Sequence, residues 1–308
     1  VSDMPFVKQT NIVDFIRHFP RRPKAYHFTH MSNAVKIIKA MKLQSRNYAE
    51  GNFSNSAGSN VHRTNKAHRF ARFYFMPKSP TQFYNECLGK DCSDRKYYER
   101  AYNLGLPKCP VPVFFIFDVE ELLMAMPDKC YYSNGNMQKD SSRCFKVTEE
   151  PNRIKAREIY VNSFDTFDER QQEFLVEGEV DFSKLKNVAI CCYDSFQAEM
   201  LREELQGTQW EDVVSEGPAL FERKNKELFF NDSADTIRIN TDYLNPFEFK
   251  VSYTDSVPTI VNKNDVIRQR GHDIYMSSMV EIKKDVPFDI FFEVNSPRPG
   301  SWLIYKNK

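Results

Sequence analysis

The feature that most constrains the fold is a change in the sequence pattern near Asp232. Before this point, short apolar runs typical of strands mix irregularly with amphipathic segments of helical period. After it, strand-like segments follow one another, separated by Asn, Asp and Pro turns and without helical periodicity. We therefore expect an α+β fold with a mixed sheet and helices, followed by a small all-β domain of sandwich or barrel type. The expected domains are residues 1–228 and 229–308.

Local signals predict several elements of the first part. Pro110–Phe117 is a continuous apolar run typical of a buried strand, and Ala25–His30 is expected to form another strand. Ser32, Asp118 and Ser195 each precede an apolar pattern of helical spacing, which predicts that they are helix N-caps. These elements do not follow the regular alternation of a doubly wound sheet, so the α+β class is favoured.

Further strands are expected in the second half of the chain. The predicted strands are Glu173–Val180, Asn187–Asp194, Thr236–Asn240, Phe247–Tyr253, Asp273–Ile282, Asp289–Val294 and Ser301–Tyr305.

Composition excludes some classes of function. The 43 Lys and Arg residues nearly balance the 42 Asp and Glu residues, so the overall charge gives no sign of nucleic-acid binding, although local patches remain possible. No apolar run approaches the ~20 residues that cross a bilayer, and no signal-peptide pattern is present. The 7 cysteines include no C-x-x-C pair, so we expect no metal site and a reduced, cytoplasmic protein.

Two of the 6 histidines, His27 and His30, flank Thr29 just before a predicted helix. They could ligate a metal, perform acid–base catalysis, bind a ligand or simply end a strand. No glycine-rich phosphate loop, H-E-x-x-H or G-x-S-x-G motif is present, so several common enzyme classes lack support.

Three segments together indicate a family. YHFTHMSNAVKII (26–38), ARFYFMPKSPTQFY (71–84) and QQEFLV (171–176) occur in that order. In order and spacing they resemble the DarT family, toxin ADP-ribosyltransferases that use NAD to modify bases of single-stranded DNA. The resemblance implies an ADP-ribosyltransferase-like mixed sheet and NAD as the ADP-ribose donor.

The resemblance also implies the catalytic residues. Glu173 is expected to hydrogen-bond a ribose hydroxyl and to activate the incoming base, beside a transition state that resembles an oxocarbenium ion. Arg63 best matches the family's arginine before the F-Y-F segment, with Arg69 and Arg72 as alternatives; it is expected to hold NAD and to polarise the base.

The residues expected to bind NAD come from the first motif and the segment after it. His27 is expected to hold the adenosine ribose, and Thr29, on the same face of the strand, the nicotinamide amide. Asn33, Leu43 and Arg46 are expected to line the pocket. His30 points to the other face and is expected to be structural.

The chain departs from the family pattern at two places. Lys78 replaces the arginine of the P-R-S-P segment, and lysine cannot form a bidentate fork. Asn134 and Asn136 stand where some relatives carry a histidine. The base that is modified, and the choice between DNA and RNA, therefore stay open.

The leading hypothesis is a toxin of a toxin–antitoxin or phage-defence system that attaches ADP-ribose to a base of single-stranded DNA or RNA. The resemblance implies an antitoxin partner, for example a macrodomain hydrolase. The alternatives are an ADP-ribosyltransferase acting on protein or free nucleotide, and a non-catalytic nucleic-acid-binding module.

Overall fold

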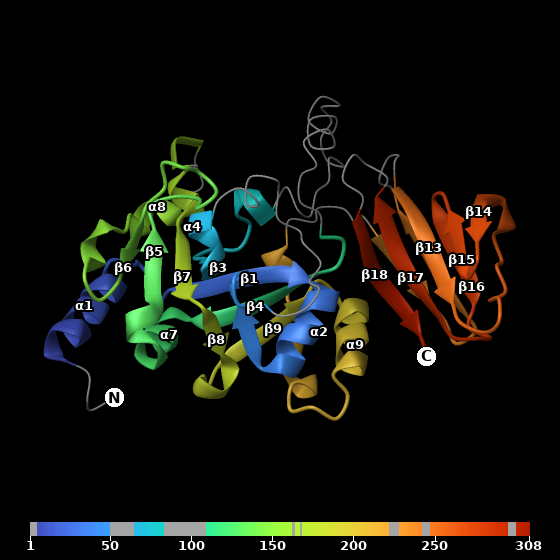
Figure 1. The fold of residues 1–308 in the computed structure, drawn as a ribbon, viewed down its shortest axis with the longest axis horizontal. Coiled ribbons are helices and arrows are strands. Elements are labelled where there is room, and N and C mark those ends of the chain that lie inside the picture. The colour runs from blue at the N-terminus through green and yellow to red at the C-terminus, as the bar shows by residue number, and fades with distance from the viewer. Residues whose placement is uncertain are drawn as a thin grey trace.

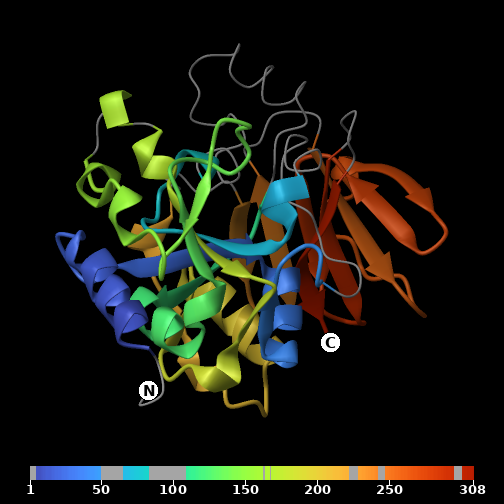
Figure 2. The same cartoon turned by 60° about the vertical axis from the view of Figure 1, so that its left-hand side comes forward.

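A computed structural model describes residues 5–49, 65–82, 109–161, 164–166, 168–221, 228–241, 247–294 and 300–308. Figure 1 shows a part with helices and strands, coloured from blue to yellow, beside a group of strands in orange and red. The turned view in Figure 2 separates the same two groups. A large mixed sheet with helices, together with separate antiparallel sheets, confirms the predicted α+β class.

The large sheet has eight strands in the order β10-β9-β4-β1-β3-β7-β5-β6. Strands β9 and β10 are parallel, and the other neighbours are antiparallel. The strands are β1 (Lys24–His30), β3 (Phe70–Tyr74), β4 (Pro112–Asp118), β5 (Cys130–Ser133), β6 (Cys144–Lys146), β7 (Glu173–Glu177), β9 (Val188–Cys192) and β10 (Val214–Glu216). The two segments predicted as strands, Ala25–His30 and Pro110–Phe117, therefore form neighbouring central strands.

The predicted strand Glu173–Val180 is in fact two strands. Gly178 has a φ of 80°, a left-handed conformation that glycine adopts without steric cost, and the chain turns there. β7 ends before this glycine, and β8 (Glu179–Asp181) pairs with β2 (Lys42–Gln44) in a separate two-stranded sheet. The turn thus confines β7 to the segment that begins with Glu173.

The described α-helices lie in the first part of the chain. The structure contains α1 (Phe6–Arg17), α2 (Met31–Ala40), α4 (Asn65–His68), α7 (Val119–Ala125), α8 (Ala156–Ile159) and α9 (Ser195–Glu204). Within the described ranges, none of them has the length and apolar character needed to cross a membrane.

Asp118 caps α7 as predicted, by accepting from the amides of Glu120 and Glu121. The other two predicted caps were wrong by one or two positions. His30 caps α2, because its Nδ1 accepts from the amide of Ser32 at 3.2 Å. Asp194 caps α9, because its carboxylate accepts from the amide of Gln197 at 2.9 Å, and carboxylates are strong caps.

Two antiparallel sheets form the C-terminal part. One has the order β11-β12-β16 and the other β14-β15-β13-β17-β18. The strands are β11 (Leu228–Asp232), β12 (Thr236–Thr241), β13 (Phe247–Tyr253), β14 (Val266–Arg270), β15 (Asp273–Met276), β16 (Met279–Lys283), β17 (Phe288–Val294) and β18 (Gly300–Asn307). The predicted strand Asp273–Ile282 is wrong as one element, since it supplies β15 to one sheet and β16 to the other.

α9 connects the two parts of the structure. The Phe196 ring stacks on Phe230 of β11 with centroids 4.8 Å apart, and more loosely on Tyr305 of β18. At the end of the helix, the Glu204 carboxylate lies 3.5 Å from the Lys308 ammonium. The C-terminal sheets are therefore packed against the helix that follows β9, as Figure 1 shows.

Candidate active site

The site begins at an opening in the large sheet. Strands β1 and β4 pair along all 7 residues of β1. By contrast, the described residues of β1 and β3 share a single register pair, Tyr26 and Tyr74. Beyond this pair the two strands diverge, so the next backbone groups lack the ladder partners that a closed sheet would supply.

The side chain of His27 enters this opening. Its Nδ1 lies 3.0 Å from the backbone carbonyl oxygen of Arg72, so Nδ1 donates to a group that the diverging ladder leaves unpaired. The ring also lies edge-on to Phe73, with centroids 5.9 Å apart. Because a neutral imidazole protonated at Nδ1 carries its lone pair on Nε2, His27 offers an acceptor at Nε2.

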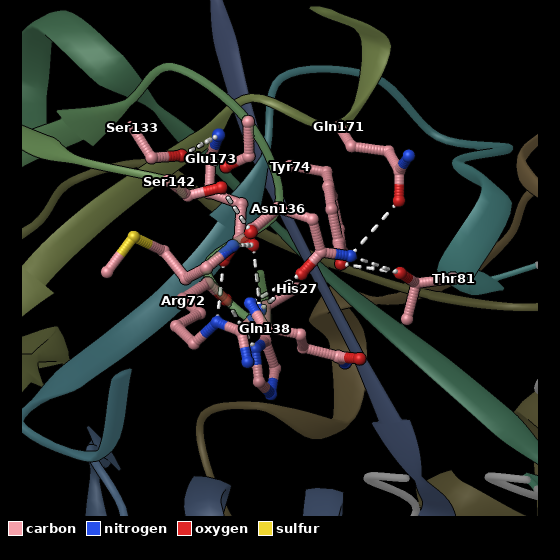
Figure 3. Close-up of polar contacts among 12 residues, drawn as sticks. His27, Arg72, Tyr74, Thr81, Ser133, Asn136, Gln138, Ser142, Gln171 and Glu173 are labelled. Atoms are coloured by element: carbon pink, nitrogen blue, oxygen red, sulfur yellow. Dashed lines mark hydrogen bonds and ion pairs between the residues drawn. The ribbon is translucent and has the colours of Figure 1, made fainter. Parts of the chain in front are cut away.

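On the neighbouring strands, Arg72 of β3 binds Glu173 of β7. Arg72 Nε lies 2.6 Å from Glu173 Oε2, and Arg72 Nη2 lies 2.7 Å from Oε1, which is a bidentate ion pair (Figure 3). The register explains the geometry: Tyr74 lies opposite Glu173, and Arg72, two residues away, projects to the same face. The Glu173 side chain is 0% exposed and that of Arg72 is 20% exposed.

A loop between β5 and β6 completes the surroundings of Glu173. The amide of Met137 donates to Glu173 Oε1 at 2.8 Å, and the amide of Glu173 donates to Ser133 Oγ at 2.9 Å. Asn136 Oδ1 lies 3.4 Å from Arg72 Nη2, and its Nδ2 donates to Gln171 Oε1 at 3.1 Å. The Glu173 carboxylate thus accepts three hydrogen bonds, of about four that its two oxygens can accept.

Burial and charge set the protonation states at this site. Desolvation lowers the pKa of His27 to about 4, so the ring is neutral near pH 7. Burial alone would lower the pKa of Arg72, but the Glu173 carboxylate outweighs burial and raises it. Burial and the Glu173 charge together raise the pKa of Tyr74. The site therefore holds the ion pair of Arg72 and Glu173, a neutral acceptor on His27 and a neutral phenol on Tyr74.

The structure brings together some of the other predicted residues. Asn33 Nδ2 donates to Thr29 Oγ1 at 3.1 Å, and both side chains are buried. Leu43 is 1% exposed and packs in the core on β2, so any contact of Leu43 with NAD must come from its backbone. Arg46 is exposed, and its Nη1 lies 3.5 Å from His68 Nε2 of α4.

Arg63, the first choice for the catalytic arginine, lies outside the described residues, and its role stays a prediction. Of the two alternatives, Arg72 binds Glu173, whereas Arg69 lies 3.8 Å from Glu177 and over the ring of Phe70. The role of Ser133 and Met137 was missed, because their contacts with Glu173 use a hydroxyl and a backbone amide, and neither leaves a sequence pattern. Among the described residues, no group of three or more His, Cys, Asp or Glu side chains is arranged to hold a metal ion.

Comparisons with known proteins give a consistent result. The family described as "ssDNA thymidine ADP-ribosyltransferase, DarT" matches residues 26–221, which is more than half of the chain. No protein of curated function matches the chain.

Solved structures of DarT proteins match the chain at low sequence identity. DarT from Thermus sp. 2.9 in complex with ADP-ribosylated ssDNA has a TM-score of 0.50 at 17% sequence identity, covering 66% of this chain and 98% of that one. The same protein in complex with NAD+ has a TM-score of 0.49 at 15% identity, with 66% and 99% covered. DarTG from Thermosipho africanus in complex with ADP-ribose has a TM-score of 0.43 at 16% identity, with 65% and 51% covered.

Proposed function

The chain belongs to the DarT family of ssDNA thymidine ADP-ribosyltransferases, and on this basis we propose that it transfers ADP-ribose from NAD to a base of single-stranded DNA. The observation that carries the proposal is the buried ion pair between Glu173 and Arg72, set beside the opening in the sheet that His27 enters. A carboxylate and a guanidinium fixed beside a neutral acceptor suit a reaction that develops positive charge on a ribose.

The proposed reaction is a pentosyl transfer. The bond between the nicotinamide nitrogen and C1′ of the ribose breaks, and nicotinamide leaves with the electron pair. A ring nitrogen of the base bonds to C1′ and loses its proton. Thymine, the base in the family's description, has one ring N–H in a nucleoside, at N3, so we propose N3 as the nucleophile.

In this reaction Glu173 is the catalytic residue. Its Oε2 accepts a hydrogen bond from Arg72 Nε and can accept a second from a ribose hydroxyl or from the base N–H. Because the carboxylate is 0% exposed, a neighbouring side chain must move before substrate reaches it. Arg72 supplies the counter-charge and fixes the orientation of the carboxylate through two bonds.

His27 is proposed to bind NAD. Its Nε2 can accept a hydrogen bond from a ribose hydroxyl, because Nδ1 already donates to the carbonyl of Arg72. Thr29 and Asn33, which are joined by a hydrogen bond, are proposed to face the nicotinamide amide. Arg46 is proposed to bind a phosphate of NAD. Leu43 is kept as a backbone contact, and Arg63 as a second arginine over the reaction centre.

The family membership supports proposals about the biological setting. We propose a cytoplasmic toxin of a toxin–antitoxin or phage-defence system, silenced by an antitoxin such as a macrodomain hydrolase that removes the mark. The division into a catalytic domain (1–228) and a small β domain (229–308) is part of the same proposal. RNA in place of DNA remains the alternative substrate to be tested.

The test compares substrates in parallel. The wild-type protein is incubated with labelled NAD and, separately, single-stranded DNA, RNA of the same sequence and a protein pool. Transfer of label to DNA, and its loss in Glu173→Gln, is the expected result. Label on RNA alone or on protein alone would replace the DNA proposal, and no label in any pool would overturn it.

A further inference from the structure

A second structural unit supports the carboxylate of Glu173. The loop that follows β5 folds back on itself, because Ser142 Oγ donates to the carbonyl of Asn136 at 2.6 Å and the amide of Ser142 donates to the carbonyl of Lys139 at 3.1 Å. The same loop presents the Met137 amide to Glu173 and the Asn136 side chain to Arg72. Its shape therefore determines where two partners of the ion pair lie.

The ammonium group of Lys66 holds this loop from outside. Lys66 Nζ lies 2.8 Å from the carbonyl oxygen of Lys139, 3.0 Å from that of Asp140 and 2.9 Å from that of Ser142. A lysine ammonium has three donors, and here each of them has a backbone acceptor. Within the described ranges no carboxylate forms an ion pair with Lys66, so its charge is met by carbonyl dipoles alone.

An apolar cluster joins the same two segments. Ala67 of α4 and Phe70 of β3 pack with Met137 of the loop and Leu175 of β7, and all four side chains are buried. Lys66 is next to Ala67 in α4, so the polar and apolar contacts act on the same short helix. Met137 contributes its side chain to this cluster and its amide to Glu173. The cluster and the ammonium together fix the loop against α4.

We propose that Lys66 is a positioning residue for the transfer reaction. By linking three carbonyl groups of the loop, it holds the Met137 amide and the Asn136 side chain where they orient Glu173 and Arg72. The inference rests on the proposed function for its kinetic part only. It also places α4 in direct contact with the loop whose Met137 amide binds Glu173. In the sequence, α4 begins two positions after Arg63.

The decisive variant is Lys66→Met, which keeps the length of the side chain and removes its three donors. The matched control is Lys139→Met in the same loop, whose ammonium pairs with the exposed carboxylate of Asp168. We expect kcat for transfer to fall about tenfold or more in Lys66→Met, because small misplacement of a catalytic group is costly, while KM for NAD stays within about twofold of wild type. Lys139→Met should match wild type in both.

A second readout does not depend on activity. Hydrogen exchange of the Met137 amide, which Glu173 protects, should speed up in Lys66→Met and stay unchanged in Lys139→Met. Equal kcat and equal exchange in the two variants would overturn the inference. If wild type shows no transfer, the proposed function fails, and the exchange comparison still decides the role of Lys66.

A further pair of variants covers the case in which Lys66→Met does not fold. Lys66→Arg retains a cation with several donors. It should keep more activity than Lys66→Met. If Lys66→Met is unfolded, Lys66→Arg should remain folded, with a kcat below that of wild type. Ser142→Ala removes the bond to the carbonyl of Asn136 and leaves the Ser142 carbonyl for Lys66. Wild-type kcat and Met137 exchange in both Lys66→Arg and Ser142→Ala would contradict the inference.

Discussion

The guanidinium of Arg72 binds both carboxylate oxygens of Glu173, with donor–acceptor distances of 2.6 and 2.7 Å, although the two residues are 101 positions apart in the sequence. The pair lies on adjacent strands of an interior region of the sheet, and its carboxylate has no solvent contact. An isolated buried charge is costly, so the two side chains depend on each other for stability as well as for chemistry.

Replacing Arg72 should therefore affect folding. Arg72→Ala leaves the Glu173 carboxylate buried without its counter-charge and should lower the free energy of unfolding by about 3–5 kcal/mol. Arg72→Lys should lower the free energy of unfolding by less, since lysine keeps the positive charge and loses the second hydrogen bond to the Glu173 carboxylate. Denaturant unfolding measures both. The control is Lys155→Ala, which breaks an exposed ion pair with Glu169 and should cost less than about 1 kcal/mol; an equal loss in the two would contradict the assignment.

His27 should contribute to NAD affinity. His27→Ala removes the Nε2 acceptor and should weaken NAD binding about tenfold, the value of one hydrogen bond of ~1.4 kcal/mol. Calorimetric titration with NAD measures the change. His18→Ala is the control, because the His18 side chain is exposed and its ring bonds the Asn152 side chain. An affinity equal to that of the control would remove His27 from the NAD site.

Two histidines with lowered pKa values predict the dependence of stability on pH. Desolvation lowers the pKa of His27 to about 4 and that of His30 to about 3, below the ordinary value of 6.5. Both rings are neutral in the folded protein, while the unfolded chain takes up protons below about pH 6.5. Stability should therefore be full above pH 6.5 and decline as the pH falls toward 4 and then 3, because the unfolded state binds more protons.

His30→Asn tests this directly. Asparagine retains an acceptor for the amide of Ser32, which His30 caps, and does not titrate. The slope of unfolding free energy against pH between 6.5 and 4 should be shallower in His30→Asn than in wild type, by up to about 1.4 kcal/mol per pH unit. Parallel slopes would show that His30 is not held neutral by burial.

The contact between α9 and the C-terminal sheets should contribute to stability. Phe196→Ala removes a ring whose centroid lies 4.8 Å from that of Phe230, and it should lower the free energy of unfolding by about 2 kcal/mol. This loss is smaller than for removal of a fully buried phenylalanine ring, since Phe196 is half-buried. Thermal unfolding of Phe6→Ala provides the control, because Phe6 is 82% exposed. If both variants melt alike, the interface adds little to folding.

The sequence predicted both central strands, β1 and β4, and the burial of β4 is a local property because β4 is a continuous apolar run. The sequence did not predict strand boundaries that are set by backbone geometry. Gly178 divides a continuous strand pattern, and the predicted strand from Asp273 to Ile282 passes from one sheet to the other. His30 was correctly expected to be structural, but its capping role was assigned to Ser32, the usual residue type for a cap.

The candidate site likewise contains features that could be predicted from the local sequence and features that could not. Glu173 was chosen from a motif, and its strand was predicted from the pattern around it. The pairing of Arg72, rather than Arg69, with Glu173 was not predicted, since it depends on the register of β3 against β7, and the preference for Arg63 stays a prediction. The support from Lys66 is invisible for another reason: its partners are backbone carbonyl groups, which every residue type has.

The most direct test of the account is nucleoside mass spectrometry after reaction of the wild-type protein and Glu173→Gln with NAD and a single-stranded DNA containing all four bases. The substitution keeps the size of the side chain and removes its charge. We predict an ADP-ribosylated nucleoside, on thymidine, in the wild-type reaction and at least about a hundredfold less with Glu173→Gln. Unmodified DNA with folded wild-type protein, or equal modification by both proteins, would contradict the account.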